Sequence, residues 1–319
     1  MATTIDLPAI DQVLREPRPS GPTAWPRIVW DFCRRKPLGG IGLVIIVVML
    51  FCALFVDGIL FGSREPLLAP YHYNDQTFGD ENLGMSLDHP LGTDQLGRDI
   101  FSRILYGARI SVILGISIVA IAAFVSLAMG TATGYFSGWF DTITQRFVDI
   151  ILAIPPLILL IYSLSVFAGT SGPYGRMFWI ILIVGIVLAV QSIRVIRGAA
   201  ISTANNPYVD AARTLGATNA RIVFRHILPN VVPVAIVLST VQVGTAILAE
   251  AAVSFLGLGI PEPFPSWGTM LNLTGASQFR AFPIQAVWPG VAIALAVYGF
   301  NMFGDALRDV IDPRLRGSR

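Results

Sequence analysis

The sequence NNPYVDAARTLG (residues 205–216), followed by HILP (residues 226–229), lies in a polar segment from Arg194 to Asn230 that two long apolar segments flank. This segment holds five arginines against one acid, Asp210. A simple connection between two membrane spans does not need this length, this basic charge or a helical pattern. We interpret the segment as a docking element on the cytoplasmic face of a membrane protein.

The composition indicates an integral membrane protein. Of the 319 residues, 54% are hydrophobic and 13% are charged, and the mean hydropathy is +0.67, whereas a soluble domain carries roughly 25% charged residues. The net charge of +2 gives no indication of nucleic-acid binding. The only lysine, Lys36, is followed by Pro37, so the Gly-Lys-Ser/Thr of a Walker A loop is missing. We therefore expect this chain not to bind ATP through such a loop.

Apolar runs of about 20 residues, the length that crosses a bilayer, predict six transmembrane helices and an all-α polytopic membrane protein. The first 36 residues are polar and proline-rich, and the first apolar run begins only at Leu38. We therefore expect this first run to be an uncleaved membrane anchor rather than part of a signal peptide. The third span contains Pro155-Pro156, where we expect a kink. The six predicted spans are Leu38–Phe61, Ile110–Thr133, Phe147–Ala168, Met177–Val195, Val231–Leu256 and Ala286–Gly304.

The distribution of arginine and lysine predicts that both termini lie in the cytoplasm. The segment Gly62–Ile104 holds three basic residues against seven acids, so we assign it to the outside. The segment Arg194–Asn230 then lies inside, as does the C-terminal tail. The supporting basic residues are Arg27, Arg34, Arg35 and Lys36 before the first span, and Arg308, Arg314, Arg316 and Arg319 after the last.

These spans divide the chain into five parts. They are a cytoplasmic N-terminal tail (1–36), a first transmembrane helix (37–62), an extracytoplasmic loop (63–104), a core with five transmembrane helices (105–305) that includes a cytoplasmic loop (198–230), and a cytoplasmic C-terminal tail (306–319).

Local signals in the polar segment predict a short helix that ends at a glycine. Asn206 is a good N-cap, and Pro207 suits the first helical position. Asp210 falls in the first turn, where the helix dipole favours an anion, and it can pair with Arg213 three residues later. Gly216 is suited to the C′ position that stops a helix.

A second short helix is predicted after this glycine. Thr218 can cap a helix from Asn219 to Ile227, which we expect Pro229 to end. Two short capped helices of this kind can fit a cleft in a partner protein. The alternative is an amphipathic segment that lies on lipid headgroups and has no protein partner.

The spacing of Asp210-Ala211-Ala212, Gly216 and His226-x-Leu228-Pro229 resembles the Glu-Ala-Ala loop of ABC importer permeases, with aspartate in place of glutamate and with His226 in place of isoleucine. In that family the loop forms a coupling helix that sits in a groove of the ATPase subunit. The resemblance implies an ATPase-coupling role for Asp210, Ala211, Ala212, Arg213, Gly216, Arg221, His226, Leu228 and Pro229.

Further segments resemble the oligopeptide, dipeptide and nickel permease subfamily, second-permease type. They are HPLGTDQLGRDIFSRILYGARISVILG (89–115), EAAVSFLGLG (250–259) with Trp267-Gly268, and NMFGDALRD (301–309) with Asp312-Pro313-Arg314. The resemblance extends from Pro37 to Arg316. It implies a type I ABC importer permease fold. It also implies a non-catalytic subunit that forms half of the translocation path for di- or oligopeptides. The alternative solutes are nickel and oligosaccharides.

The same resemblance implies the rest of the transporter. Its expected partners are a second homologous permease, two ABC ATPase subunits that bind the ATP and Mg, an extracytoplasmic solute-binding protein and the lipid bilayer. No cofactor is expected in this chain and no nucleic acid as a partner. The expected location is the bacterial or archaeal plasma (inner) membrane, which the chain crosses several times.

Glu250 lies in the outer half of the fifth predicted span. An acid inside a membrane segment is costly and indicates a functional site by default, so one hypothesis places Glu250 on the translocation path. We favour a structural role, in which Glu250 caps a helix break near Gly257 or pairs with an arginine such as Arg109.

Charged residues next to the spans admit two interpretations each. Asp94, Arg98 and Asp99 either contact a partner or fix a turn before the second span, and closely spaced charges with glycine and proline favour the turn. Asp305, Arg308, Asp309 and Asp312 either contact the ATPases or form a solvated helix end. His72 and His89 lack metal-ligand spacing.

Two other protein classes are alternatives, and each would require different features in the sequence. A self-sufficient secondary transporter needs inverted repeats with matched broken spans, whereas the sequence has a single Pro-Pro break without a matching partner. An intramembrane enzyme needs a nucleophile and base, or paired metal ligands, within the spans, and among acids in the spans only Glu250 stands out.

Overall fold

The computed structural model describes residues 25–58, 65–169, 172–273 and 276–311. These residues fold almost entirely into helices, with two isolated β-bridges, Asp57–Pro66 and Thr93–Asp99, near one end of the molecule. The prediction of an all-α membrane protein is confirmed. The predicted N-terminal tail falls mostly on residues 1–24, which lie outside the described residues.

Within the described residues, five helices are long and apolar enough to cross a membrane, and a bent pair of helices is the candidate for a sixth span. The bent pair consists of α5 (Trp139–Ala153) and α6 (Pro156–Phe167). The long helices are α3 (Pro37–Phe55), α4 (Ile100–Tyr135), α7 (Pro173–Ala204), α10 (Leu228–Phe255) with the short helical turns before it, and α13 (Ile284–Ile311).

The predicted kink at Pro155-Pro156 is confirmed, and it is a 93° break between α5 and α6. Proline has no N–H to donate into the preceding turn, and it holds the residue before it in an extended conformation. Pro155 is extended accordingly, with φ −53° and ψ 125°, and Pro156 starts the next helix.

The second span begins earlier than the sequence suggested. α4 starts at Ile100, so the predicted span from Ile110 is the continuation of a 36-residue helix. Its N-cap is Asp99, whose Oδ2 accepts a hydrogen bond of 2.7 Å from the Ser102 N–H. This bond satisfies a backbone donor that would otherwise be unpaired at the start of a buried helix.

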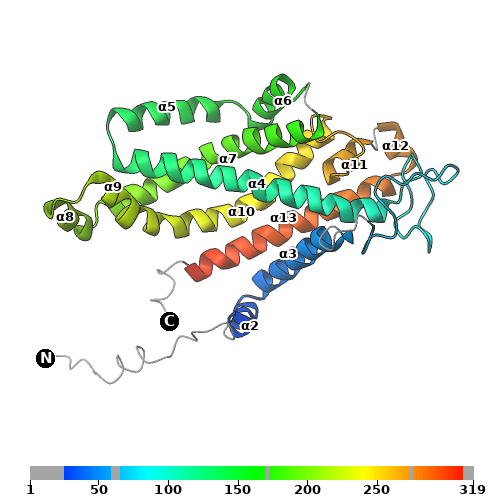
Figure 1. Ribbon diagram of the computed structural model, residues 1–319, viewed down its shortest axis with the longest axis horizontal. Helices are drawn as coiled ribbons and strands as arrows, with labels where there is room; N and C mark the ends of the chain where they lie inside the picture. The colour runs from blue at the N-terminus through cyan, green and yellow to red at the C-terminus, as the bar shows by residue number, and fades with distance from the viewer. Residues whose placement is uncertain (1–24, 59–64, 170–171, 274–275, 312–319) are drawn as a thin grey trace.

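The core forms where α4 lies along α7 and α10 packs against both, while α3 and α13 complete the bundle on the other side of α10 (Figure 1). Side chains such as Ile118, Val184 and Ile247 are fully buried there. Close helix approach depends on small residues, as is common in membranes. A Cβ on Gly134 of α4 would lie 2.8 Å from the Arg197 carbonyl oxygen of α7.

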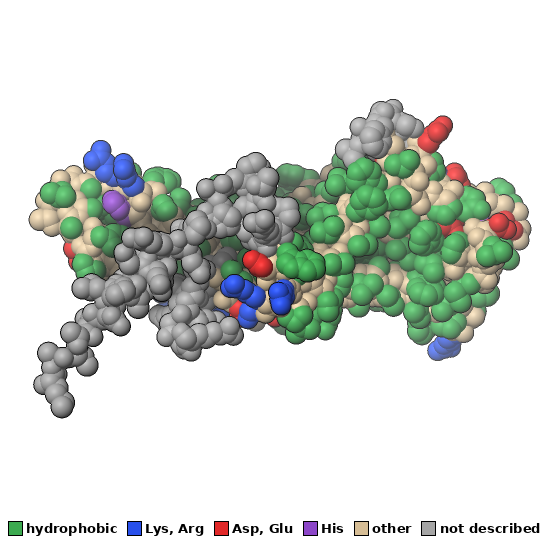
Figure 2. Space-filling view, turned by 90° about the horizontal axis from the view of Figure 1, so that it is seen from below, with side chains coloured by type: hydrophobic (Ala, Val, Ile, Leu, Met, Phe, Trp, Pro, Cys, Tyr) green, Lys and Arg blue, Asp and Glu red, His purple; other side chains and the backbone are tan. Residues whose placement is uncertain are grey.

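The outer side of α3 is apolar and exposed, as expected of a helix that faces lipid. The residues concerned recur at helical spacing and are at least half exposed: Val44, Val47, Val48, Phe51 and Leu54. Figure 2 shows a broad hydrophobic surface over one half of the molecule and basic side chains gathered at the end that α8 and α9 form.

The short elements lie at the two ends of the bundle (Figure 1). α8 (Pro207–Thr214) and α9 (Asn219–Ile222) form one end, while α11 (Trp267–Leu273), α12 (Ala276–Ala281) and the segment before α4 lie at the other.

An additional helix, α2 (Trp25–Arg35), precedes the first span and packs against α3. The Phe32 ring meets Phe303 of α13 edge to face, with ring centroids 6.0 Å apart. The Lys36 ammonium lies 2.6 Å from Oδ2 of Asp309. The start of the first span is thereby joined to the last turns of α13.

Candidate functional site

The first short helix of the polar segment forms as predicted. α8 spans Pro207–Thr214, with Asn206 at the N-cap position and Pro207 in the first turn, although the Asn206 side chain makes no capping hydrogen bond. The Arg213 guanidinium lies 3.4 Å from Oδ1 of Asp210, so the predicted pair along the helix is present. Both side chains are about half exposed or more.

Gly216 ends α8 in the predicted way. Its φ of +79° lies in the left-handed region, which a side chain with a Cβ disfavours. Its N–H donates to the Arg213 carbonyl at 2.9 Å, and the Ala217 N–H donates to the Ala212 carbonyl at 3.0 Å. These two bonds form a Schellman motif, which satisfies carbonyls that the helix end would leave unpaired and fixes the corner between α8 and α9.

The second helix is capped as predicted but does not end as predicted. Thr218 Oγ1 accepts a hydrogen bond of 3.3 Å from the Arg221 N–H at the start of α9. A π turn (Val223–Ile227) follows and leads directly into α10, so Pro229 lies in the first turn of a continuing helix. The prediction that Pro229 stops the helix is therefore wrong, because the wider π turn accommodates the proline ring next to the preceding turn.

A buried hydrophobic cluster attaches α8 and α9 to the bundle. Val209 of α8 and Ile222 of α9 are fully buried, as is Ile227 in the π turn. They pack with Ile196 and Ala200 of α7, and the same cluster includes Val231 and Ala235 at the start of α10. Because packed interiors are dense and transmit displacement, Val209 links α8 mechanically to the ends of α7 and α10.

The predicted coupling residues are mostly accessible at this end of the bundle. Asp210, Ala211, Arg213, Gly216, Arg221 and Pro229 are exposed, while Ala212, His226 and Leu228 are partly exposed. The Arg213 guanidinium lies 5.5 Å from the ring centroid of Tyr135 in α4, and the Tyr135 hydroxyl donates to Asn219 Oδ1 at 2.7 Å.

Two exposed apolar residues on the same end were missed by sequence reasoning. Leu215 is 89% exposed and Phe224 is 70% exposed, beside basic residues and outside the predicted spans. Apolar patches rimmed by polar residues mark protein–protein contacts, so these two side chains are candidates for such a contact. The sequence contained a signal, since both large apolar residues stand in the polar segment between the predicted spans.

The first two arginines of the polar segment do not belong to this surface. Arg197 binds Asp141 of α5 through two hydrogen bonds, and Arg194 pairs with Asp149 of the same helix. Both arginines lie on α7, which continues as a helix to Ala204. They hold α5 against α7, so the candidate docking surface begins only after the end of α7.

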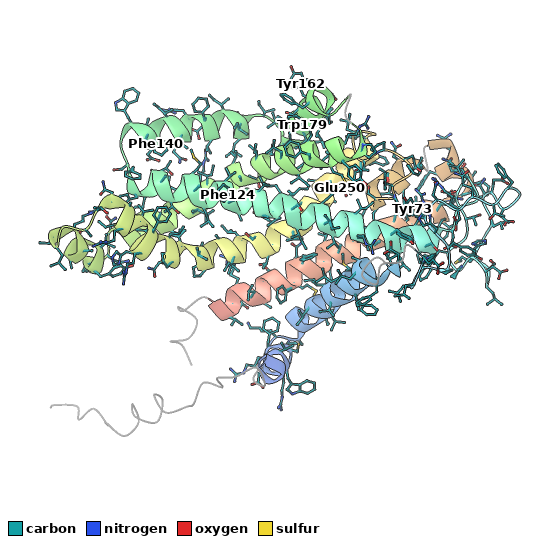
Figure 3. The ribbon with its side chains drawn as sticks, in the orientation of Figure 1. Tyr73, Phe124, Phe140, Tyr162, Trp179 and Glu250 are labelled. Carbon is teal, nitrogen blue, oxygen red and sulfur yellow. The ribbon has the colours of Figure 1, made fainter. Side chains whose placement is uncertain are left out.

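Glu250 is fully buried in α10 near α11 (Figure 3). Ser254 Oγ, one turn later, donates to Glu250 Oε1 at 2.6 Å. α11 covers this part of α10 closely, because a Cβ on Gly268 would lie 2.5 Å from the Ala251 carbonyl oxygen. The structural and translocation-path roles of Glu250 both stay predictions.

The proposed pairing of Glu250 with Arg109 is wrong. Arg109 lies in α4, and its guanidinium donates to both carboxylate oxygens of Asp57, at 2.9 and 2.8 Å. Its Nε also donates to the Ala53 carbonyl oxygen at 2.6 Å. Arg109 therefore ties the first turns of α4 to the end of α3, a contact that the sequence did not reveal.

The charged residues before α4 fix a turn. Asp94 accepts the backbone N–H groups of Leu96 and Arg98, at 2.8 and 3.0 Å, and the Nε of Arg98 at 2.7 Å. Asp99 caps α4, and its Oδ1 lies 3.0 Å from His89 Nδ1. These bonds support the turn interpretation of this segment.

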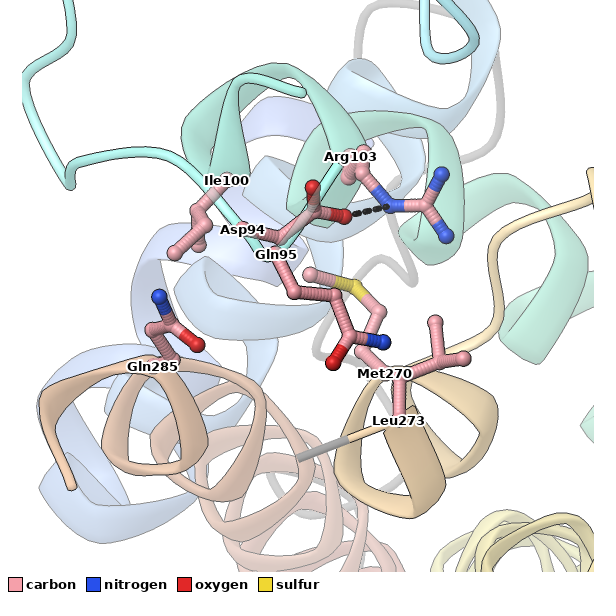
Figure 4. Close-up of a pocket in the computed structure, with 7 residues that line it drawn as sticks. All are labelled: Asp94, Gln95, Ile100, Arg103, Met270, Leu273 and Gln285. Atoms are coloured by element: carbon pink, nitrogen blue, oxygen red, sulfur yellow. Dashed lines mark ion pairs between the residues drawn. The ribbon is translucent and has the colours of Figure 1, made fainter. Parts of the chain in front are cut away.

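Glu262, which sequence reasoning missed, completes the same network from the loop between α10 and α11. Its carboxylate accepts Nη1 of Arg98 at 2.5 Å and Nη2 of Arg103 at 3.1 Å. Both arginines are only 1% exposed. Figure 4 shows Arg103 and Asp94 beside a small cavity of about 20 Å³ that Met270 of α11 also lines.

The residues after the last predicted span remain helical. α13 continues to Ile311, and Asp305 and Arg308 face a cavity of about 860 Å³ between α7, α10 and α13. Gln242 of α10 lines the same cavity and donates to Ser192 Oγ at 2.6 Å. Asp312 lies outside the described residues.

Two models of known protein families match this chain, and together they cover most of it. Residues 124–317 match a family model described as "Binding-protein-dependent transport system inner membrane component". Residues 23–85 match a second model, described as the N-terminal TM domain of oligopeptide transport permease C.

The chain also resembles individual proteins along most of its length. It is 36% identical to the oligopeptide transport system permease protein OppC of Bacillus subtilis, over 89% of this chain and 88% of that protein. It is 36% identical to the glutathione transport system permease protein GsiD of Escherichia coli, over 90% of each chain. A solved chain of the MetNI methionine ABC transporter, in an inward-facing conformation, aligns over 63% of this chain with 20% identity and a TM-score of 0.46.

Proposed function

The chain belongs to the family of binding-protein-dependent transport system inner membrane components, and from this premise we propose that it imports di- or oligopeptides and receives the energy of ATP through α8. Members of this family are non-catalytic, multi-pass permease subunits of ABC transporters, and so is this chain. The peptide substrate is supported by its similarity to an oligopeptide permease and to a permease for glutathione, which is itself a small peptide.

The observation that carries the coupling proposal is the attachment of α8. The helix is exposed on one side, through Asp210 and Arg213, and is held to the bundle on the other by Val209. The Schellman motif at Gly216 makes the corner rigid. A partner that displaces α8 therefore displaces the packed ends of α7 and α10 with it.

The proposed partner at this end is an ABC ATPase subunit. The exposed side chain of Leu215 supplies an apolar contact, and the neighbouring arginines favour an acidic groove. ATP and Mg would be bound by two such subunits rather than by this chain. A second homologous permease and an extracytoplasmic solute-binding protein complete the proposed complex in the plasma (inner) membrane of a bacterium or archaeon.

The cavity of about 860 Å³ is the proposed contribution of this chain to the translocation path on the side of α8. Gln242, Asp305 and Arg308 line it together with apolar residues of α10. The amide of Gln242 suits the amides of a peptide, and the charged groups of Asp305 and Arg308 suit its charged termini. Because α10 forms part of both the cavity and the cluster beneath α8, a movement of α8 would reshape the cavity wall.

Co-purification of the full-length chain with its ATPase chains tests the coupling proposal. We expect Leu215→Arg to abolish the association, because it places a cation where an apolar contact is proposed, while the chain still inserts. The matched control is Leu87→Arg, since Leu87 is fully exposed at the opposite end of the molecule. Equal recovery of ATPase chains with Leu215→Arg and with the control would contradict a coupling role for this surface.

Uptake of a radiolabelled di- or tripeptide by cells that lack other peptide importers tests the substrate proposal. Expression of the complete transporter should restore ATP-dependent uptake. Uptake of nickel or of an oligosaccharide without any peptide uptake would refute it.

A further inference from the structure

A second cavity, of about 420 Å³, opens at the end of the molecule opposite α8. Its walls come from the segment before α4, the first turns of α4, the start of α7 and the loop after α10. Figure 3 shows Tyr73, one of its lining residues, at this end of the bundle. Cavities of about 300–1,000 Å³ are typical of small-ligand sites.

Aromatic rings form one continuous wall of this outer aromatic cavity. Tyr73 is the centre of the wall, with its ring centroid 5.1 Å from that of Tyr106, 4.2 Å from that of His72 and 6.1 Å from that of Phe264. Tyr174 continues the row, 6.4 Å from Phe264. Rings at these separations pack edge to face or offset, and they leave π faces and ring edges available to a further ring or alkyl group.

The Tyr106 side chain adds a polar group to this wall. Tyr106 is only 5% exposed, and among the residues that the structure describes its hydroxyl has no hydrogen-bond partner. A buried hydroxyl without a partner is unfavourable by an amount comparable to a lost hydrogen bond. A ligand that brought an amide group next to this hydroxyl would supply the missing partner.

The charges in the cavity balance each other. Asp57 and Arg109 both line it, and the Arg109 guanidinium binds both carboxylate oxygens of Asp57. Neither an inorganic anion nor a free cation finds an uncompensated charge in this pair. The cavity therefore suits an uncharged group with a flat or apolar body and one polar hydrogen-bonding function.

We propose that the outer aromatic cavity is a subsite for an aromatic or apolar side chain of the imported peptide, with a peptide amide of the same ligand hydrogen-bonded to the Tyr106 hydroxyl. The proposal rests on the proposed peptide-import function and adds a preference to it. The subsite lies at the end where an extracytoplasmic binding protein would release the peptide. Alanyl-phenylalanine should use the subsite fully, and alanyl-alanine much less.

Peptide binding to the purified complete transporter, followed by saturation-transfer NMR without ATP, tests the subsite directly. We expect the ring protons of alanyl-phenylalanine to receive saturation from the wild-type protein, and this signal to fall in Tyr106→Phe and Tyr73→Leu. Tyr106→Phe removes a hydroxyl that makes no hydrogen bond, so folding should be retained. Tyr298→Leu, at an exposed site on α13, is the matched control and should leave the signal unchanged.

Uptake kinetics provide the second readout. The KM for alanyl-phenylalanine should rise about 2- to 10-fold in both cavity variants, the factor that a lost ring contact or hydrogen bond supplies. In Tyr73→Leu, which removes only a ring contact, the KM for alanyl-alanine and the maximal rate should change little. An equal loss for both peptides in Tyr73→Leu, or no change in NMR signal and KM in either variant, would overturn the proposal.

The two readouts separate this inference from the proposed function. If peptide is taken up and neither Tyr106→Phe nor Tyr73→Leu changes its binding or KM, the peptide-import function stands and the subsite is ruled out. Tyr106-dependent binding without any peptide uptake retains the subsite and eliminates the peptide-import function.

Discussion

Arg197 of α7 donates two hydrogen bonds of 2.6 Å to the two carboxylate oxygens of Asp141 in α5. A bidentate pair of this kind fixes orientation as well as distance. Together with the pair between Arg194 and Asp149, it fastens α5 along the side of α7. Ion pairs therefore hold α5 against α7 in addition to the apolar packing of Val148.

Asp141→Asn should lower the stability of the protein in detergent by about 1–2 kcal/mol, because it weakens both hydrogen bonds of a pair that is only partly exposed. A lower apparent midpoint of thermal unfolding measures the effect. Asp149→Asn is the control, since its pair is about half exposed on both sides and should contribute within about 0.5 kcal/mol. Equal midpoints for the two variants would show that the bidentate geometry is unimportant.

Gly216→Pro should uncouple ATP hydrolysis from uptake while the chain still inserts. Proline cannot adopt the φ of +79° found at this position and has no N–H to donate to the Arg213 carbonyl. Gly216→Ala should act in the same direction more weakly, through a strain of about 1–2 kcal/mol. Hydrolysis and uptake are measured on the same reconstituted complex.

The control for Gly216 is Gly198→Ala. Gly198 lies within α7, where a Cβ meets open space, so the substitution should leave both rates unchanged. Normal uptake by Gly216→Pro would rule out a coupling role for the corner.

Glu250→Gln should change uptake no more than it changes stability if the carboxyl is structural. The amide oxygen can still accept the Ser254 hydroxyl, which bonds to Glu250 at 2.6 Å. Glu250→Leu should destabilise by about 1–3 kcal/mol, since it leaves the buried Ser254 hydroxyl without its acceptor. Uptake and thermal midpoint measured together decide between the roles: a loss of uptake by Glu250→Gln at unchanged stability would place the residue on the translocation path.

Glu262→Gln should destabilise the protein, because Arg98 and Arg103 are buried and would lose a shared carboxylate. Breaking a fully buried ion pair costs about 3–5 kcal/mol. Here Glu262 is about one third exposed and Asp94 still bonds to Arg98, so we expect about 1–3 kcal/mol. The exposed Glu81→Gln is the control, and an identical thermal midpoint for both variants would show that the network is not stabilising.

Local signals in the sequence predicted local structure well. The helix from Pro207, its pair between Asp210 and Arg213, the corner at Gly216 and the cap at Thr218 all depend on residues within five positions of one another. Capping and turn chemistry act at that range, so a single sequence contains the information. The apolar runs were equally informative, because span length is set by the bilayer.

Contacts between distant segments could not be predicted. Glu262 meets arginines about 160 residues earlier, and Arg109 meets Asp57 rather than Glu250. A sequence gives the charge of each residue but not the packing that selects its partner. The prediction that Pro229 ends the second short helix was wrong for a related reason. A proline usually ends a regular α-helix, but here a π turn precedes Pro229 and the helix continues.

Lys36, whose ammonium contacts Asp309, is the only lysine in the polypeptide. An amine-selective reagent consequently has a single side-chain target, located where the amino-terminal helix meets the last turns of α13. A fluorophore or crosslinker introduced there without any mutagenesis would report whether that junction opens or remains closed as the transporter turns over.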